Sequence, residues 1–134
     1  MREILFRGKR LGNGEWVEGY YVYDDSGQTK EEPIAYIYYL NKHTCGWDLI
    51  PFEVDPSTVG QYTGLLANGK RIFEGDIIRW LPAFEEKTDV VFFDEAGFVA
   101  GKYFLQSALY YGDFDGEVIG NIYDNPELAG GSNG

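Results

Sequence analysis

The chain has 134 residues, which is enough for one domain, or for two small barrel-like halves that share a core, and too few for two independent domains. Its formal net charge is −11, and an acidic surface repels phosphate at long range, which disfavours direct nucleic-acid binding. The 11 tyrosines, 9 phenylalanines and 18 glycines suit short strands and tight turns, so we expect a mainly β protein.

Cysteine usage and hydropathy bear on the compartment. Cys45 is the single cysteine and cannot form an intramolecular disulfide. No apolar stretch reaches the ~20 residues that a membrane helix needs, and no segment near the first residue has the order of a signal peptide. We therefore expect a soluble, cytoplasmic protein.

The first elements in chain order are predicted to be a β-hairpin and a further strand. Ile4 and Phe6 alternate with Leu5 and Arg7 before a glycine-rich turn at 12–14, and a second bulky run follows at 16–23. This pattern is typical of a hairpin. After a polar loop at 24–27, the β-branched and aromatic residues of 34–40 predict another strand.

Residues 41–56 are predicted to be interrupted. Their apolar side chains occur in short patches broken by Gly46, Pro51 and Pro56. Proline removes a backbone donor and restricts the residue before it. The sequence therefore favours short extended pieces here over one long strand.

The second half of the chain contains several hairpin signals. Asn68-Gly69 is the strongest, because both central positions of a type I′ turn need a positive φ. Strands are predicted at 77–81, and at 90–93 and 98–105 as a second hairpin; residues 120–126, with apolar contacts from Val118 and Ile119, are predicted to be the last strand, which seals the barrel. Short strands at intervals of about ten residues suggest a small, bent, SH3-like barrel.

These elements give the predicted domain organisation. Residues 1–128 form one domain, with an N-terminal β region at 1–58 and a barrel-like region at 59–128. The barrel itself spans about residues 60–125, and the N-terminal hairpin and strands pack on it. Residues 129–134 are rich in glycine and serine and are predicted to be a flexible tail.

A dense motif runs from Val59 to Arg79, where a Tyr-Thr-Gly-Leu box precedes an Asn-Gly-Lys turn and an Ile-Phe-Glu-Gly-Asp-Ile-Ile run. This motif resembles the YopX family of small phage and prophage proteins. Segments at 2–10, 14–19 and 117–128 match the family in order and spacing, so the resemblance covers nearly the whole chain. It implies a phage or prophage protein in a bacterial host cell, from a family without an established biochemical function.

Two acidic residues in this motif invite a catalytic interpretation. Glu74 and Asp76 lie two residues apart, so on a strand they share a face and could share a metal or a proton. The structural interpretation is favoured: the Asp76 carboxylate accepts backbone N–H bonds from a neighbouring turn, and Gly75 allows the bend. We therefore predict no catalytic residue at this point.

A second candidate for chemistry is the group of His43, Cys45 and Asp48. A cysteine with a histidine can form a nucleophile and base pair, or two metal ligands. The chain has only one cysteine and one histidine, so no closed zinc site of nitrogen and sulfur ligands can form within it. A lone cysteine is more often a small buried hydrophobe. No metal and no cofactor is predicted.

Binding residues are predicted in three places. Neighbouring tyrosines on a strand point to opposite faces, so part of the two tyrosine runs should be exposed and form an interface. Two basic residues at the predicted hairpin tip, together with Arg79, could grip a phosphate or an acidic surface. Acidic residues in the second half could imitate nucleic acid in the basic groove of a host protein. The candidates are Tyr20, Tyr21, Tyr36, Tyr38, Lys70, Arg71, Asp113, Asp115 and Glu117.

These observations favour a non-enzymatic protein that acts by protein–protein interaction, with itself as a homo-oligomer or with a bacterial host protein. Residues 1–12 are basic and residues 89–134 are strongly acidic, which also fits head-to-tail contacts between subunits. The alternative is a β-barrel module that binds nucleic acid or a small ligand. A metal-dependent enzyme that uses Glu74 and Asp76 is the least favoured interpretation.

Overall fold

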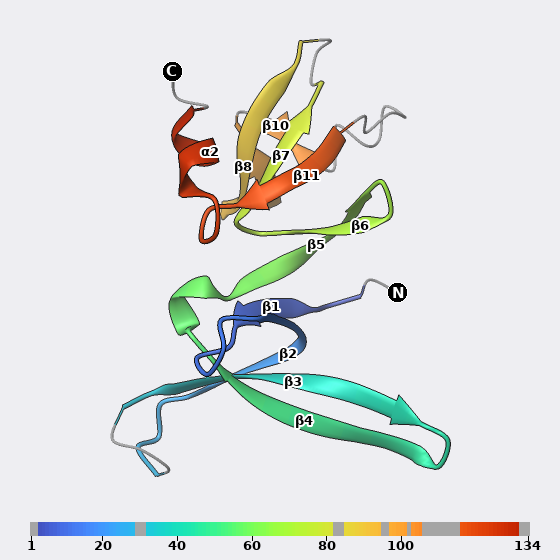
Figure 1. Cartoon of the computed structure of the whole chain (residues 1–134), viewed down its shortest axis with the longest axis vertical. Helices are drawn as coiled ribbons and strands as arrows, with labels where there is room; N and C mark the ends of the chain where they lie inside the picture. The colour runs from blue at the N-terminus through green and yellow to red at the C-terminus, as the bar shows by residue number, and fades with distance from the viewer. Residues whose placement is uncertain are drawn as a thin grey trace. The chain divides into compact units, whose positions relative to one another are not determined.

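A computed structural model describes residues 3–28, 32–81, 85–94, 97–101, 103–105 and 116–131. Antiparallel strands dominate these ranges (Figure 1), which confirms the expectation of a mainly β protein. Within them, no helix is long and apolar enough to cross a membrane. The chain divides into two compact units, Met1–Gln61 and Tyr62–Gly134, where the sequence predicted a change of region at residue 58.

The first unit is a twisted antiparallel sheet in the order β4-β3-β2-β1-β5. Strand β2 changes partner along its length: its first half pairs with β1 and its second half with β3. Strand β5 begins in this unit beside β1 and continues into the second unit. The elements are β1 (Phe6–Lys9), β2 (Trp16–Asp24), β3 (Ile34–His43), β4 (Gly46–Val54), the short 3-10 helix η1 (Pro56–Thr58) and β5 (Gly60–Ala67).

One face of this sheet carries the hydrophobic core of the first unit. Val17, Ala35, Ile37 and Val54 are buried together, and half-buried aromatic and aliphatic side chains of neighbouring strands pack around them. Gly19 marks the place where β2 crosses from β1 to β3, because a Cβ there would collide with the Tyr38 carbonyl oxygen. The predicted hairpin of β1 and β2 and the predicted strand β3 are confirmed.

Strand β4 corrects the prediction of short extended pieces at 41–56, since it runs unbroken through Pro51. The strand lies at the edge of the sheet. The Leu11 N–H donates to the Glu53 carbonyl at 3.2 Å, so the backbone groups of Glu53 face away from β3. Backbone groups two residues apart point to the same side, so Pro51 also faces outward, and its missing N–H costs no bond to β3.

The second unit contains a five-stranded antiparallel sheet in the order β10-β9-β8-β7-β11, and a hairpin of β5 and β6. The Asn68-Gly69 turn of that hairpin has φ values of 51° and 79°, as the sequence predicts for a type I′ turn. The remaining elements are β6 (Lys70–Phe73), β7 (Asp76–Trp80), β8 (Lys87–Asp94), β9 (Gly97–Ala100), β10 (Tyr103–Phe104), β11 (Gly116–Asn121) and α2 (Pro126–Gly131).

Three details of the second unit differ from expectation. Strand β11 pairs with β7 at one edge of the sheet and does not seal a barrel, so the pairings among the described strands remain open. The single strand expected at 98–105 is divided at Gly101 into β9 and β10, which pair with each other. Helix α2 extends through Gly131, so part of the predicted flexible tail is helical, and residues 132–134 lie outside the described part.

Candidate functional site

The strand register of the first unit sorts its side chains onto two faces. Residues directly opposite each other on paired strands share a face. Ile37 lies opposite Tyr21 and Phe52, and all three belong to the core side. Residues an odd number of positions away on the same strand point to the other side of the sheet, which we call the outer face. Its members are Tyr20, Val22, Tyr36, Tyr38, Leu40, Trp47, Leu49 and Pro51.

The outer face presents a contiguous surface of aromatic and aliphatic side chains. Trp47 is 63% exposed, Tyr20 47%, Leu49 46% and Val22 44%. The remaining members fill the rows between them, and the rings of Tyr36 and Tyr38 contact each other with centroids 6.1 Å apart. Single exposed apolar residues are ordinary, whereas a contiguous exposed patch marks an interaction site.

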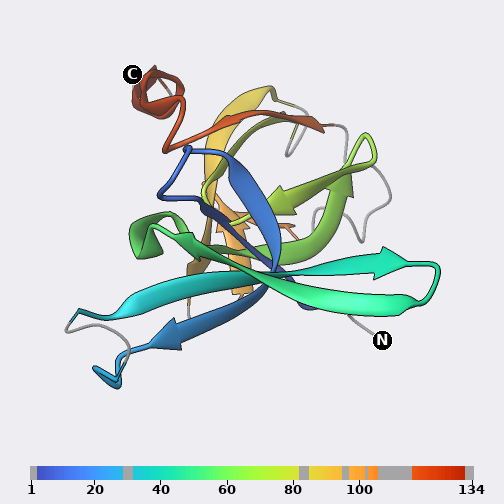
Figure 2. The ribbon, with the colours of Figure 1, turned by 60° about the horizontal axis from the view of Figure 1, so that its bottom comes forward.

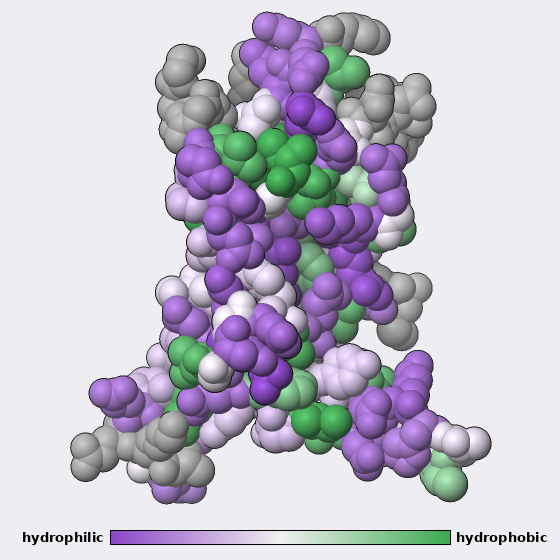
Figure 3. Space-filling model, in the orientation of Figure 1, coloured by the Kyte–Doolittle hydropathy of each residue, from purple (hydrophilic) through white to green (hydrophobic). Residues whose placement is uncertain are grey.

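Part of the outer face lies on a projecting arm. Beyond Tyr38, strand β3 has lost its partner β2, and the remaining residues 39–50 pair only within the β3–β4 hairpin. Figures 1 and 2 both show this hairpin running out as a long two-stranded ribbon. Figure 3 shows pale and green surface on it beside hydrophilic atoms; tyrosine and tryptophan are near the middle of the hydropathy scale and are drawn pale. An isolated two-stranded hairpin is marginally stable in water.

The arm also carries the predicted group of His43, Cys45 and Asp48. The His43 Nε2 atom lies 3.1 Å from Asp48 Oδ2 across the two strands, and both side chains are exposed. Cys45 is an exposed free thiol in the turn at the tip. In the described parts of the chain, no group of three or more His, Cys, Asp or Glu side chains could hold a metal ion.

The predicted tyrosine candidates divide between the two faces. Tyr20, Tyr36 and Tyr38 lie on the outer face, but Tyr21 packs on the core side against Phe6, with ring centroids 5.6 Å apart. Burial raises the pKa of Tyr21 above its ordinary value of 10.0, and the nearby Tyr23 adds to the rise. Tyr21 therefore does not belong to the outer face.

Sequence reasoning missed the contribution of β4 to the outer face. Trp47, Leu49 and Pro51 alternate with Asp48 and Ile50, a period-two signal that identifies one face of a strand. The prediction of short, separate pieces at 41–56 left this alternation unused. Once β4 is known to be continuous, its alternate residues line up with those of β3.

The motif carboxylates have a structural arrangement. Asp76 is 1% exposed, and its Oδ2 atom accepts the backbone N–H of Phe73 at 2.7 Å. The Gly75 N–H donates to the Val91 carbonyl, also at 2.7 Å, and fixes the same turn to β8. Glu74, which precedes Gly75 in this turn, is half-buried. This is the turn-binding arrangement that the structural interpretation predicts for Asp76.

Among the predicted charged candidates that the structure describes, Arg71 and Glu117 make contacts with other side chains. Lys70 and Arg71 are exposed at the start of β6, and the Arg71 guanidinium lies over the Tyr62 ring, 5.7 Å from its centroid. Arg79, which was expected to join them, forms ion pairs with Glu117 and with Glu86. Asp113 and Asp115 lie outside the described residues.

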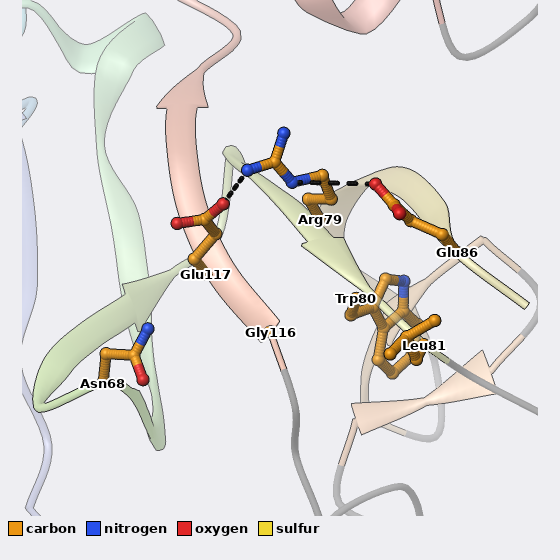
Figure 4. A pocket seen from close by; sticks show the side chains of 7 residues that line it. All are labelled: Asn68, Arg79, Trp80, Leu81, Glu86, Gly116 and Glu117. Atoms are coloured by element: carbon orange, nitrogen blue, oxygen red, sulfur yellow. Dashed lines mark hydrogen bonds and ion pairs between the residues drawn. The ribbon is translucent and has the colours of Figure 1, made fainter. Parts of the chain in front are cut away.

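A shallow pocket of about 280 Å³ lies beside the Arg79 ion pairs in the second unit. Figure 4 shows the Arg79 side chain between the carboxylates of Glu117 and Glu86, so its charge is already compensated. The pocket is small and open compared with typical ligand sites. Its lining residues are Asn68, Arg79, Trp80, Leu81, Glu86, Gly116 and Glu117.

Comparisons with known proteins identify the family of the chain. A search of curated proteins finds no match. Among solved structures, the crystal structure of protein EF1440 from Enterococcus faecalis is similar, with a TM-score of 0.60 and 25% sequence identity over 96% of this chain and 99% of that chain. The sequence profile described as YopX protein matches residues 5–129. Because this match spans nearly the whole sequence, the chain belongs to the YopX family.

Proposed function

We propose that this protein is a non-enzymatic protein-binding module that docks a partner protein through the outer face. The observation that carries the proposal is the outer face itself, where Trp47, which is 63% exposed, and Leu49, which is 46% exposed, adjoin a row of tyrosines. Tyrosine and tryptophan supply large, rigid contact area and are enriched at protein interfaces.

The proposal places the protein in the cytoplasm of a bacterial host cell, as a phage or prophage product. The net charge of −11 supports a protein partner over nucleic acid, because phosphate contacts supply most non-specific nucleic-acid affinity. The proposal also keeps a bent, SH3-like arrangement for the second unit. Its support is the succession of short antiparallel strands from β5 to β11.

The test is affinity capture from bacterial lysate on the immobilised protein, with and without nuclease. We expect a specific protein, either a host protein or an added tagged copy of this chain, to be retained after nuclease treatment, and to be lost when Leu49→Ser is placed on the outer face. Leu66→Ser is a matched control, because Leu66 is similarly exposed, at 51%, on β5 of the second unit. Capture that both variants preserve, or that nuclease abolishes, would overturn the proposal.

A further inference from the structure

We propose that the occupant of the outer face is a second copy of this chain, packed face to face about a two-fold axis with the strands of the two copies antiparallel. This inference rests on the proposed protein-binding role of the outer face and names the partner. It is carried by the distribution of charge along the face.

Charged residues occur at the two ends of the outer face, and the signs are opposite. Lys42 lies at the arm end, opposite Trp47 on β4. Asp24 lies at the other end, opposite Ile34, and Glu53 lies opposite Tyr36. The rows between these ends are aromatic or aliphatic.

The spacing of the charges about the middle row is regular. Tyr38 lies in that row, between Tyr20 and Pro51. Along β3, Lys42 is four residues beyond Tyr38, and Ile34, which is paired with Asp24, is four residues before it. A two-fold axis across the strands at Tyr38 therefore brings the arm end of each copy over the acidic end of the other.

Such an arrangement satisfies the requirement of a two-fold interface, which uses one surface patch twice and must be complementary to itself. Each Lys42 lies over the acidic end of the other copy, near Asp24 and Glu53, while the tyrosine rows pack on each other at the centre. A face that carried charges of one sign along its whole length would repel the same face of a second copy. Ends of opposite charge instead attract each other and fix how the two copies align. The projecting β3–β4 arm, which is only marginally stable as an isolated hairpin, is also stabilised because the second copy buries its outer face.

The area of the face is suitable for a stable contact. Four large side chains that are 44–63% exposed, with the half-buried rows and the charged ends, would bury on the order of 600–900 Å² in each copy. Stable interfaces bury about 800 Å² in each partner. The outer face is therefore large enough to hold a dimer without the second unit.

The experiment is a charge exchange followed by sedimentation equilibrium of the full chain at about 0.15 M salt, where long-range repulsion is screened. We expect the wild type to be a dimer, and Lys42→Glu and Glu53→Lys each to weaken dimerisation by about tenfold or more, because like charges then meet twice. An equimolar mixture of the two variants should restore the dimer as a heterodimer. Lys87→Glu, on β8 of the second unit, is the matched control and should leave dimerisation unchanged.

Three outcomes would overturn this inference. The wild type could stay monomeric up to about 1 mM, Lys42→Glu and Glu53→Lys could each leave dimerisation unchanged, or the mixture of the two variants could fail to form a heterodimer. Unchanged circular dichroism of each variant excludes misfolding as the cause. A monomeric wild type that still captures a different protein, lost in Leu49→Ser, would leave the protein-binding function intact and reject only the second copy as partner. A wild type that neither dimerises nor captures a protein through the outer face would reject both proposals.

Discussion

Asp76 shows how a single buried carboxylate holds a turn in the second unit. Its side chain accepts the Phe73 N–H, and Phe73 itself is 2% exposed. A backbone donor left without its acceptor in such a place costs about 1–3 kcal/mol. We expect Asp76→Ala to lower the free energy of unfolding by about this amount, as measured by urea denaturation.

The half-buried Glu74 provides the control for Asp76. Glu74→Gln keeps size and polarity, so we expect a change within about 0.5 kcal/mol. Thermal shifts with divalent metal ions test the enzymatic alternative on the same variants. A metal-dependent stabilisation of the wild type that disappears in Asp76→Asn would favour a metal site over the structural role.

Tyr21 gives the folded state a dependence on alkaline pH. Its pKa is raised above 10.0 because burial disfavours the phenolate, so the fold prefers the protonated form. Above pH 10 the unfolded chain releases this proton first, and stability falls as the pH rises through the folded pKa. We expect Tyr21→Phe to lose stability less steeply than the wild type between about pH 9 and pH 11 in urea titrations. An equal effect of Tyr20→Phe, on the outer face, would show that burial of Tyr21 is not the cause.

At the residue scale, the sequence could predict that some tyrosines are exposed but could not assign each of them to a face. The alternation of Tyr20 and Tyr21 is certain once a strand is assumed, yet either could face the core. The choice depends on partners far along the chain, since Val54 and Phe52 of β4 complete the core beside Tyr21. The role of Asp76 was predictable because its hydrogen bond is local, three residues away.

At the element scale, the β5–β6 hairpin depends on its turn conformation. Gly69 has a φ of 79°, and a Cβ added there would meet no atom within 4 Å. Gly69→Ala therefore changes backbone conformational energy alone, and we expect a loss of about 1–2 kcal/mol in the free energy of unfolding. Gly12→Ala is the matched control, since Gly12 also has open space and its φ is not positive. Equal costs at both positions would contradict this explanation.

Element boundaries were predictable where the signal is local and were wrong where tertiary position decides. The Asn68-Gly69 turn follows from two residues. Pro51 argued against a long strand, but β4 lies at a sheet edge where the missing N–H faces outward, which the sequence does not reveal. A bent barrel sealed by its last strand was predicted from strand spacing, and no closed barrel is found among the described strands. Closure depends on pairing between distant strands, which spacing does not determine.

At the scale of the whole molecule, net charge opposes self-association at low salt. Two bodies of charge −11, treated as points about 30 Å apart in water, repel by roughly 17 kcal/mol without salt, roughly 6 at 0.01 M and below 1 at 0.15 M. The exposed charge pairs at the ends of the outer face are worth only about 1 kcal/mol each. The long-range repulsion is the larger effect, and salt removes it.

We therefore expect the dimer to become tighter as sodium chloride rises from about 0.01 to 0.15 M, measured as the dissociation constant by sedimentation equilibrium. Head-to-tail contacts between the basic first residues and the acidic second half are subject to the same repulsion, but salt also weakens the attraction between their unlike charges, so they would tighten less or become weaker. Binding to nucleic acid would also weaken with salt. A dissociation constant that rises over this range would thus reject packing of the outer face on itself and favour association through unlike ends of the chain.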